Sequence, residues 1–475
     1  MMRNRRLIFL VSLLLLVTAF PVTALERKIS SQEDQEALEI TVYNSNLGLV
    51  KDQRQIKLGS GKQELKFMDV AAQIIPTSVS IKSFQETNPF SVLEQNYEYD
   101  LLSPRKLLDK YVGKEVKLFT KNPYTEREEM VSAVLLANNE NQPVFQIGQD
   151  ITFNHPGRIL FPEIPPDLIS KPTLIWLLDN QITTPQKIEA LYLTNGLNWK
   201  SDYVLVLNEQ DTRAGLSGWV TIDNKSGTTY RNARLKLVAG DIHRVKEDLI
   251  RTKKAMVAAG ALAPPQFKEE AFFEYHIYTL ERKTTLKENQ TKQISLLSVQ
   301  QIPVTKEFIY RGSQYYYRNK QGEVISNQKV GVFVLFTNSK ENHLGIPLPK
   351  GTVRAYKQDK DGSLQLIGED TIDHTPKDEK IRLKLGEAFD LKVERKQTHW
   401  EKIASDTYES AYEITLRNHK KEDVIIRVVE PLSGDWKVLE KSHPYSKLDV
   451  STIAFEVSVP KNQESKLNYR VRIRF

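Results

Sequence analysis

The last nine residues, LNYRVRIRF (residues 467–475), alternate strictly between apolar and polar side chains. Successive side chains of a β-strand point to opposite faces, so a period of two predicts a strand with one buried face. The polar face carries Arg470, Arg472 and Arg474, which we expect to face water. This stretch therefore predicts that the chain ends in a half-buried strand of an antiparallel sheet.

The same alternation recurs along the chain and predicts a mainly β, multi-domain protein. The stretch VGVFVLF (330–336) is apolar on both faces, which predicts a central strand covered on both sides. The dipeptide Asp361-Gly362 separates two strand-like runs and predicts a tight hairpin. Many short strands joined by such turns favour antiparallel sandwiches or barrels. Further strand-like runs occupy residues 38–43, 233–238, 275–280, 294–299, 412–417, 424–429 and 453–459.

Helix signals are few. Ser103-Pro104 precedes a short apolar segment that stops near Gly113, which predicts a short helix with Ser103 as its N-cap. Residues 246–263 could form a second helix, but a glycine and two prolines interrupt the pattern, so the segment also fits an insertion or linker.

These patterns divide the chain into four parts. We expect an export signal at residues 1–24, an amino-terminal β domain at 25–102, a small SH3-like β-barrel at 103–174 and a large antiparallel β-sandwich region at 175–475. The small barrel is expected because about five short strand-like runs follow the predicted helix.

The amino-terminal segment has the three parts of a secretory signal. Three arginines without an acid precede an apolar run at 7–20, and the small residues Val22 and Ala24 then fit a signal-peptidase site. The run is shorter than the roughly 20 residues that a spanning helix needs, although an uncleaved anchor is the alternative. We expect a periplasmic or secreted protein with no transmembrane segment after cleavage.

Composition narrows the class further. The 475 residues contain no cysteine, which excludes a disulfide framework and a lipid anchor on an amino-terminal cysteine. The net charge of +7 comes from 67 basic and 60 acidic residues that are mixed along the chain. No basic stripe stands out, so we expect no nucleic-acid partner.

A set of short motifs occurs together in the second half of the chain. In this order they resemble the bacterial domain-of-unknown-function 4139 family, which includes proteins described as mucoidy inhibitor A. The resemblance covers roughly residues 180 to 475 and implies a mostly β envelope protein, with no established catalytic residues to carry over. The motifs are GLNW (196–199), SDY (201–203), GWV (218–220), NKSG (224–227), LVAGD (237–241), YHIY (275–278), TKQ (291–293), PLPKG (347–351) and GEDTIDHTP (368–376).

Common catalytic motifs are absent, including the Gly-x-Ser-x-Gly elbow, the His-Glu-x-x-His zinc helix and the phosphate-binding P-loop. A polar cluster does occur at Glu369, Asp370, Asp373 and His374, followed by acids at 378 and 379. Several oxygens this close together could hold a divalent cation such as calcium, or supply a general acid and base. A loop whose side chains cap local turns is the alternative.

A second candidate is the aromatic stretch around His276. Tyr275, His276 and Tyr278 follow Glu274, and on a strand His276 and Tyr278 share one face. Rings beside a polar pair could stack on a sugar or a peptide, whereas a buried cross-strand pair is the structural alternative.

Taken together, these observations favour an exported, non-enzymatic binding or structural module whose partner is an envelope protein or polysaccharide. The alternative is an envelope-acting hydrolase with an acidic site around His374. A third reading is an assembly component whose edge strands pair with partners. No cofactor is expected beyond the divalent cation considered above.

Overall fold

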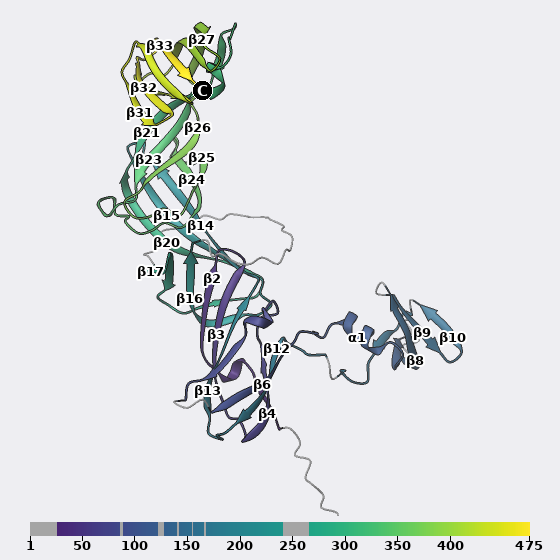
Figure 1. Cartoon of the computed structure of the whole chain (residues 1–475). Helices are drawn as coiled ribbons and strands as arrows, with labels where there is room; N and C mark the ends of the chain where they lie inside the picture. The colour runs from purple at the N-terminus through teal and green to yellow at the C-terminus, as the bar shows by residue number, and fades with distance from the viewer. Residues whose placement is uncertain are drawn as a thin grey trace, which may run out of the picture. The chain divides into compact units, whose positions relative to one another are not determined.

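The computed structural model describes residues 26–85, 89–121, 128–139, 142–153, 155–165, 168–240 and 266–475 (Figure 1). The predicted export signal at 1–24 and the segment 246–263 lie outside the described residues. Strands dominate the described ranges, which confirms the mainly β prediction. Across these ranges, no helix combines the length and the apolar character needed to cross a bilayer.

The chain divides into two compact units. The first contains the described residues of 26–36, 53–70 and 81–190, and the second contains the described residues of 37–52, 71–80 and 191–475. Strands β3 (Leu47–Ile56) and β13 (Gln186–Thr194) contribute residues to both. The remaining short elements near these boundaries are η1 (Gln32–Asp34), η2 (Pro76–Ser78) and β5 (Ser80–Ser83).

The first unit contains a four-stranded sheet in the order β1-β4-β12-β6. The indole of Trp176 on β12 is buried, donates from Nε1 to Gln95 Oε1 at 2.8 Å and meets the Phe67 ring edge-on at 5.7 Å. An indole buried with its N–H satisfied stabilises this core through its large apolar area. The strands are β1 (Glu26–Ser30), β4 (Gly61–Met68), β6 (Phe90–Glu98) and β12 (Thr173–Asn180).

A second sheet of the first unit follows the predicted short helix. Helix α1 (Pro104–Tyr111) begins after Ser103, whose hydroxyl accepts the Lys106 N–H at 3.2 Å, as expected for an N-cap. Tyr111 packs with Leu118, Leu135 and Phe145 in a small separate core. The strands are β7 (Glu115–Lys121), β8 (Glu128–Asn139), β9 (Gln142–Ile147), β10 (Asp150–Phe153) and β11 (Arg158–Leu160).

This region contains five strands, in line with the roughly five that were expected, but the predicted barrel is not closed. The order is β10-β9-β8-β7-β11, and in the described residues the two end strands pair only with their inner neighbours. Closing a barrel needs long, tilted strands in a continuous staggered register. The end strands are four and three residues long, so the sheet stays open.

In the second unit, an amino-terminal strand joins strands from the middle of the chain. β2 pairs in parallel with β16, with Val42 opposite Leu237, and the sheet continues through β18 to β17. The sequence pattern alone did not indicate this long-range pairing. The strands are β2 (Gln35–Tyr43), β16 (Tyr230–Ala239), β17 (Phe267–Phe272), β18 (Tyr275–Leu280) and β19 (Thr284–Leu286).

The next sheet of the second unit has the order β20-β15-β14-β24-β25. Its outer hairpin turns at Asp361-Gly362 as predicted, with Gly362 at φ +79°. β14 and β24 run parallel, so both strands begin at the same end of the sheet although they are far apart in sequence. The strands are β14 (Leu197–Leu207), β15 (Arg213–Asn224), β20 (Gln290–Pro303), β24 (Gly351–Gln358) and β25 (Leu364–Ile372).

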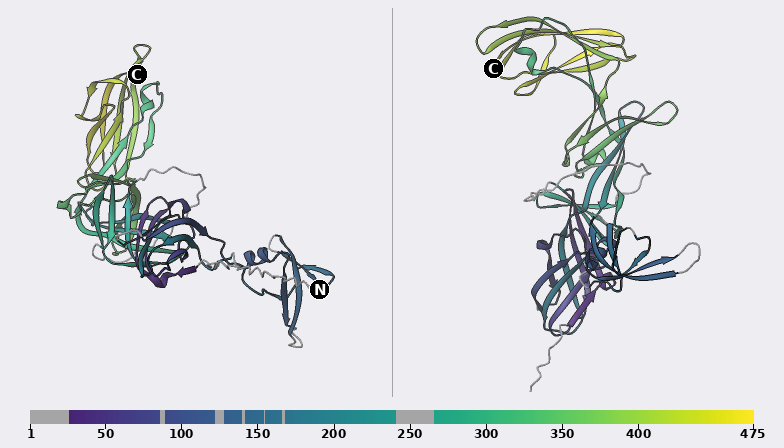
Figure 2. Two further views of the ribbon diagram at one scale, coloured as in Figure 1. Left: turned by 60° about the horizontal axis from the view of Figure 1, so that its bottom comes forward. Right: turned by 90° about the vertical axis from the view of Figure 1, so that its right-hand side faces the viewer.

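The carboxy-terminal part of the second unit is a β-sandwich (Figures 1 and 2). Its sheets have the orders β26-β23-β21-β29-β32-β31 and β22-β27-β28-β33-β30, and apolar residues from both form one core. The first sheet comprises β21 (Thr305–Arg311), β23 (Gly331–Thr337), β26 (Lys380–Glu387), β29 (Val424–Pro431), β31 (Tyr445–Asp449) and β32 (Thr452–Val459). The second comprises β22 (Ile325–Gln328), β27 (Leu391–Lys402), β28 (Thr407–Asn418), β30 (Asp435–Lys441) and β33 (Gln463–Arg474).

Two strand predictions can be checked inside this sandwich. β33 buries Leu467, Tyr469, Val471 and Ile473, which confirms the alternation at the end of the chain. β23 lies between β26 and β21, which confirms an inner strand. Two short 3₁₀ segments, η3 (Gln314–Tyr317) and η4 (Lys340–Asn342), flank β22 and β23 in the sequence.

Candidate functional site

The acidic cluster predicted from the sequence is divided between different contacts. Glu369 on β25 pairs with Arg354 Nε at 2.7 Å. Its neighbour Asp370 accepts the backbone N–H groups of Thr371 at 2.8 Å and Lys384 at 2.7 Å. Adjacent residues of a strand point to opposite faces, so these two carboxylates serve different surroundings.

The residues after β25 make separate local contacts. The Asp373 carbonyl accepts the Thr375 hydroxyl at 2.7 Å, and His374 Nδ1 accepts the Lys350 N–H at 3.2 Å. Asp378 has φ +67° and its carboxylate lies 3.3 Å from Lys377 Nζ. In the part of the chain that the structure describes, no three His, Asp or Glu side chains are grouped as metal ligands.

The aromatic candidates on β18 have separate roles. His276 Nδ1 lies 2.7 Å from Glu269 Oε1 on the neighbouring strand, and the half-buried Tyr275 ring lies 5.9 Å from the Phe273 ring. Tyr278 is buried and donates its hydroxyl to the Pro347 carbonyl at 2.8 Å. Burial raises the pKa of Tyr278, so this phenol stays neutral and remains a hydrogen-bond donor.

Near Tyr278, several of the quoted motifs meet around one hollow of about 160 Å³. Its lining includes the buried Trp199 and Pro349, which we call its floor, and the exposed Lys200 and Lys350. The contributing segments are the end of β2, the start of β14, the residues before β24 and the residues after β25. We call this the four-segment hollow; its lining is Asn44, Asn198, Trp199, Lys200, Pro349, Lys350 and His374.

Buried hydrogen bonds hold the floor of the hollow in place. Trp199 Nε1 donates to the Val238 carbonyl at 3.1 Å, and its ring lies 6.4 Å from the Tyr278 ring. The Tyr203 hydroxyl donates to the Pro349 carbonyl at 2.8 Å. Each bond satisfies a buried polar group, so the Pro347–Pro349 backbone is tied to β14 and β18.

A glycine allows β14 and β24 to approach each other closely near the hollow. Ser201 lies opposite Gly351 in the parallel register, and a Cβ on Gly351 would lie only 2.3 Å from the Ser201 carbonyl oxygen. No larger residue fits without a backbone shift, which explains the glycine that follows Lys350 in the PLPKG motif.

Sequence reasoning found only part of this site. It selected His374 and Tyr278, and it quoted Trp199 and the PLPKG segment as family motifs that were expected to be structural. It did not select Lys200 or Asn198 as binding residues, although both flank Trp199. It also missed Asn44, for which the sequence carries no signal because the residue reaches the hollow only through the pairing of β2.

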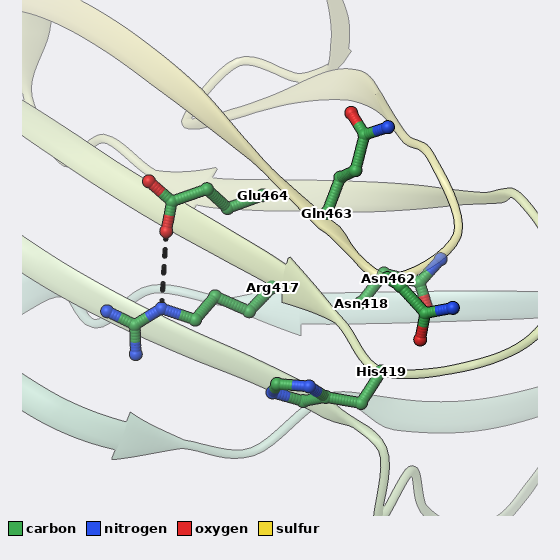
Figure 3. Close-up of a pocket in the computed structure, with 6 residues that line it drawn as sticks. All are labelled: Arg417, Asn418, His419, Asn462, Gln463 and Glu464. Atoms are coloured by element: carbon green, nitrogen blue, oxygen red, sulfur yellow. Dashed lines mark hydrogen bonds and ion pairs between the residues drawn. The ribbon is translucent and has the colours of Figure 1, made fainter.

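A second hollow of about 430 Å³ lies at one end of the carboxy-terminal sandwich, where Arg417 faces Glu464 across its rim (Figure 3). Asn418 is its one buried lining residue. The Asn418 carboxamide is occupied by backbone groups, donating to the carbonyls of Glu422 at 2.8 Å and Val459 at 3.0 Å. The buried polar group is therefore structural. The lining is Arg417, Asn418, His419, Asn462, Gln463 and Glu464.

Residues 188–475 match the model of one protein family, whose description is domain of unknown function, DUF4139. The chain belongs to the DUF4139 family. The matched range includes every lining residue of the four-segment hollow except Asn44. The match confirms the family suspected from the motifs and does not address the narrower resemblance to mucoidy inhibitor A. A search of curated proteins finds no match.

Proposed function

We propose that this DUF4139 protein is an exported, non-enzymatic binding module of the bacterial cell envelope, with the four-segment hollow as its binding site for an envelope protein or polysaccharide. The observation that carries the proposal is the convergence of four distant segments on one hollow with a rigid floor. A binding site gains affinity when its groups are held in place before the ligand arrives.

The ion pairs and hydrogen bonds of the candidate site residues favour a binding function over catalysis. Glu369 is paired with Arg354, Asp370 is bound to two backbone N–H groups, and His276 is paired with Glu269. The hydrolase alternative relied on these groups acting together near His374. General acid and base groups must reach the same reacting atoms, and the carboxylates of Glu369 and Asp370 are committed to other contacts.

The test is capture of envelope material by the purified chain. We expect immobilised protein to retain one fraction among isolated peptidoglycan, extracted surface polysaccharide and solubilised envelope proteins. Substitution Asn198→Leu should weaken this retention because it removes an amide from the hollow. The matched control is Asn468→Leu, the same change at an exposed strand position of β33.

Equal retention by both variants, or retention of no fraction by the native chain, would contradict the proposal. Release of soluble fragments from a retained fraction, abolished by His374→Asn, would favour the hydrolase instead. Recovery of the unprocessed chain from the cytosol of its native host would contradict the export part of the proposal.

A further inference from the structure

We propose that one face of the sheet β20-β15-β14-β24-β25 binds the neutral pyranose units of a glycan chain, with Trp219 as the ring on which a sugar stacks. Trp219 is not part of the lining of the four-segment hollow, so the inference goes beyond the proposed function. Three features carry it: an indole N–H without an acceptor, a hydrogen-bonded row of side chains across the sheet, and the balanced charge of that row.

Trp219 differs from the other tryptophans of the chain. The sequence has five, and each of the other four donates its indole N–H to a described acceptor. Trp219 is half-buried on β15, and among the described residues no acceptor, aromatic ring or cation is paired with its indole. A tryptophan that is partly buried usually satisfies its N–H. This indole therefore keeps a donor and part of its apolar surface for a ligand.

The neighbours of Trp219 leave its side chain accessible. Trp219 lies opposite Asp202 in the antiparallel register of β15 and β14, so the two side chains share one face of the sheet. Along β15 the neighbours on this face are Ser217 and Thr221, two positions away on either side, and both side chains are short. No bulky side chain of its own strand therefore flanks the indole.

A row of hydrogen-bonded side chains crosses all five strands beside the indole. Gln293 Nε2 on β20 donates to Thr221 Oγ1 at 3.1 Å, and the Thr221 hydroxyl donates to Asp202 Oδ2 on β14 at 3.0 Å. Arg354 on β24 continues the row, with Nη1 3.4 Å from Asp202 Oδ1 and Nε 2.7 Å from Glu369 Oε2 on β25. We call this the five-strand row. Neighbouring strands lie about 4.8 Å apart, so the row is roughly 19 Å long, which accommodates several sugar rings.

The charges of the five-strand row are balanced locally. Arg354 pairs with both Asp202 and Glu369, and the Lys200 Nζ atom lies 3.6 Å from Asp202. Two acids thus meet two bases, and the row offers no unmatched charge to an ionic ligand. A sugar hydroxyl carries no charge and both donates and accepts, so it matches such a row. The end residues, Gln293 and Glu369, are exposed and can exchange water for hydroxyl groups.

The combination of a ring and a polar row fits the two kinds of surface on a pyranose. Its faces carry C–H groups, which the negative π face of an indole attracts, and its rim carries hydroxyl groups. The row supplies amide, hydroxyl, guanidinium and carboxylate groups that are held in place by one another before a ligand arrives, which reduces the entropy lost on binding. A second half-buried ring, Tyr356, follows Arg354 by two positions on β24 and extends the same face.

Binding of the purified chain to a glycan array tests the inference. The array carries neutral oligosaccharides of glucose, galactose, mannose and N-acetylglucosamine, beside uronate and sulfated glycans. We expect at least one neutral chain to bind and, in solution, to change the tryptophan fluorescence. Trp219→Ala should bind that chain at least about tenfold more weakly and lose the fluorescence response. Gln293→Leu should weaken binding by a smaller factor, because it removes one end of the five-strand row.

Two matched controls make the same changes elsewhere. Trp436→Ala removes a half-buried indole of the carboxy-terminal sandwich, and Gln142→Leu changes an exposed glutamine on β9. Both should bind the neutral chain as tightly as the native protein. If Trp219→Ala does not fold, Gln293→Leu decides, because its side chain is exposed and its loss leaves the core intact.

Binding confined to charged glycans, no binding to any neutral chain, or full affinity in Trp219→Ala or Gln293→Leu would overturn the inference. Loss of a captured protein instead of a glycan in Trp219→Ala would assign this face to a protein partner and also overturn it. The proposed function fails separately. Envelope capture that depends on Asn198 but not on Trp219 leaves the proposed function standing without the glycan face. Capture that depends on Trp219 but not on Asn198 supports the glycan face and contradicts the hollow.

Discussion

Two arginine–carboxylate networks of the carboxy-terminal sandwich use the same chemistry in different surroundings. Inside the core, Arg395 and Glu430 both have side chains that are 0% exposed and lie 2.6 Å apart, Nη1 to Oε1. On the outer face, Glu409 accepts from Arg472 at 2.9 Å and also pairs with Arg470. Arg472 is 51% exposed, so water competes for it. The difference shows how solvent decides what an ion pair contributes.

The interior network matches every charge with protein groups. Arg395 Nη2 donates to the Tyr469 hydroxyl at 2.7 Å, and the guanidinium lies 4.0 Å from the Tyr412 ring centroid. Glu430 Oε2 accepts the Tyr317 hydroxyl at 2.7 Å. Although burial alone would lower it, the nearby Glu430 charge raises the pKa of Arg395, which stays a cation. Removing one partner would leave the other charge buried and unmatched.

The largest effect is therefore expected from Arg395→Met. This change leaves the Glu430 carboxylate buried without its cation, and the free energy of unfolding should fall by about 3–5 kcal/mol. Urea unfolding followed by tryptophan fluorescence measures the loss. The double variant Arg395→Met/Glu430→Gln should recover part of it, since no buried charge remains. A single variant as stable as the native chain would show that the interior pair is dispensable.

A smaller effect is expected on the outer face from Glu409→Gln. Its two arginines remain accessible to water, so the loss should be about 1 kcal/mol at neutral pH. Although burial alone would raise it, the hydrogen bond from Arg472 and the charge of Arg470 lower the pKa of Glu409. The folded carboxylate thus favours its ionised form more than the unfolded one, and its contribution is present at neutral pH.

The pH dependence of this variant sharpens the comparison. As the pH falls below the usual glutamate value of about 4.3 and through the lowered folded pKa, the contribution of Glu409 is lost. The stability difference between native and Glu409→Gln protein should therefore shrink toward zero in acid. Urea midpoints measured from neutral to acidic pH test this, and a difference that grows in acid would contradict it.

The smallest effect is expected from Arg474→Gln at the end of β33. Arg474 Nε lies 3.0 Å from Asp406 Oδ2, but the two side chains are 69% and 41% exposed. Exposed pairs gain little, because water solvates both charges and salt screens them. We expect no measurable change in the urea midpoint. A loss as large as that of Glu409→Gln would show that burial does not separate the two classes of pair.

The outer face also refines the expectation that the last strand shows three arginines to water. The arginines do lie on the polar face of β33, as the alternation predicted. Each of them pairs with an acid from another segment, Arg470 and Arg472 with Glu409 and Arg474 with Asp406. The partner residues belong to β28 and the residues just before it, and the pattern of β33 alone contains no information about them.

The candidate site shows a different limit of sequence reasoning. Glu369, Asp370 and His374 are close in sequence, and that closeness suggested a common site. Because side chains alternate along β25, the two carboxylates face different neighbours. Asn44 and Asn198, far apart in sequence, line the same hollow through the pairing of distant strands.

The sequence by itself determined the local structure: the alternating strands, the Ser103 cap, the Gly362 hairpin and the family motifs. These features depend on side-chain direction and backbone preference over a few residues, which can be read directly from the chain. Only the tertiary structure decided that the five-stranded sheet stays open, that β2 joins β16, and which groups surround each charge. Those outcomes depend on strand register and burial between distant segments, and local patterns do not specify either.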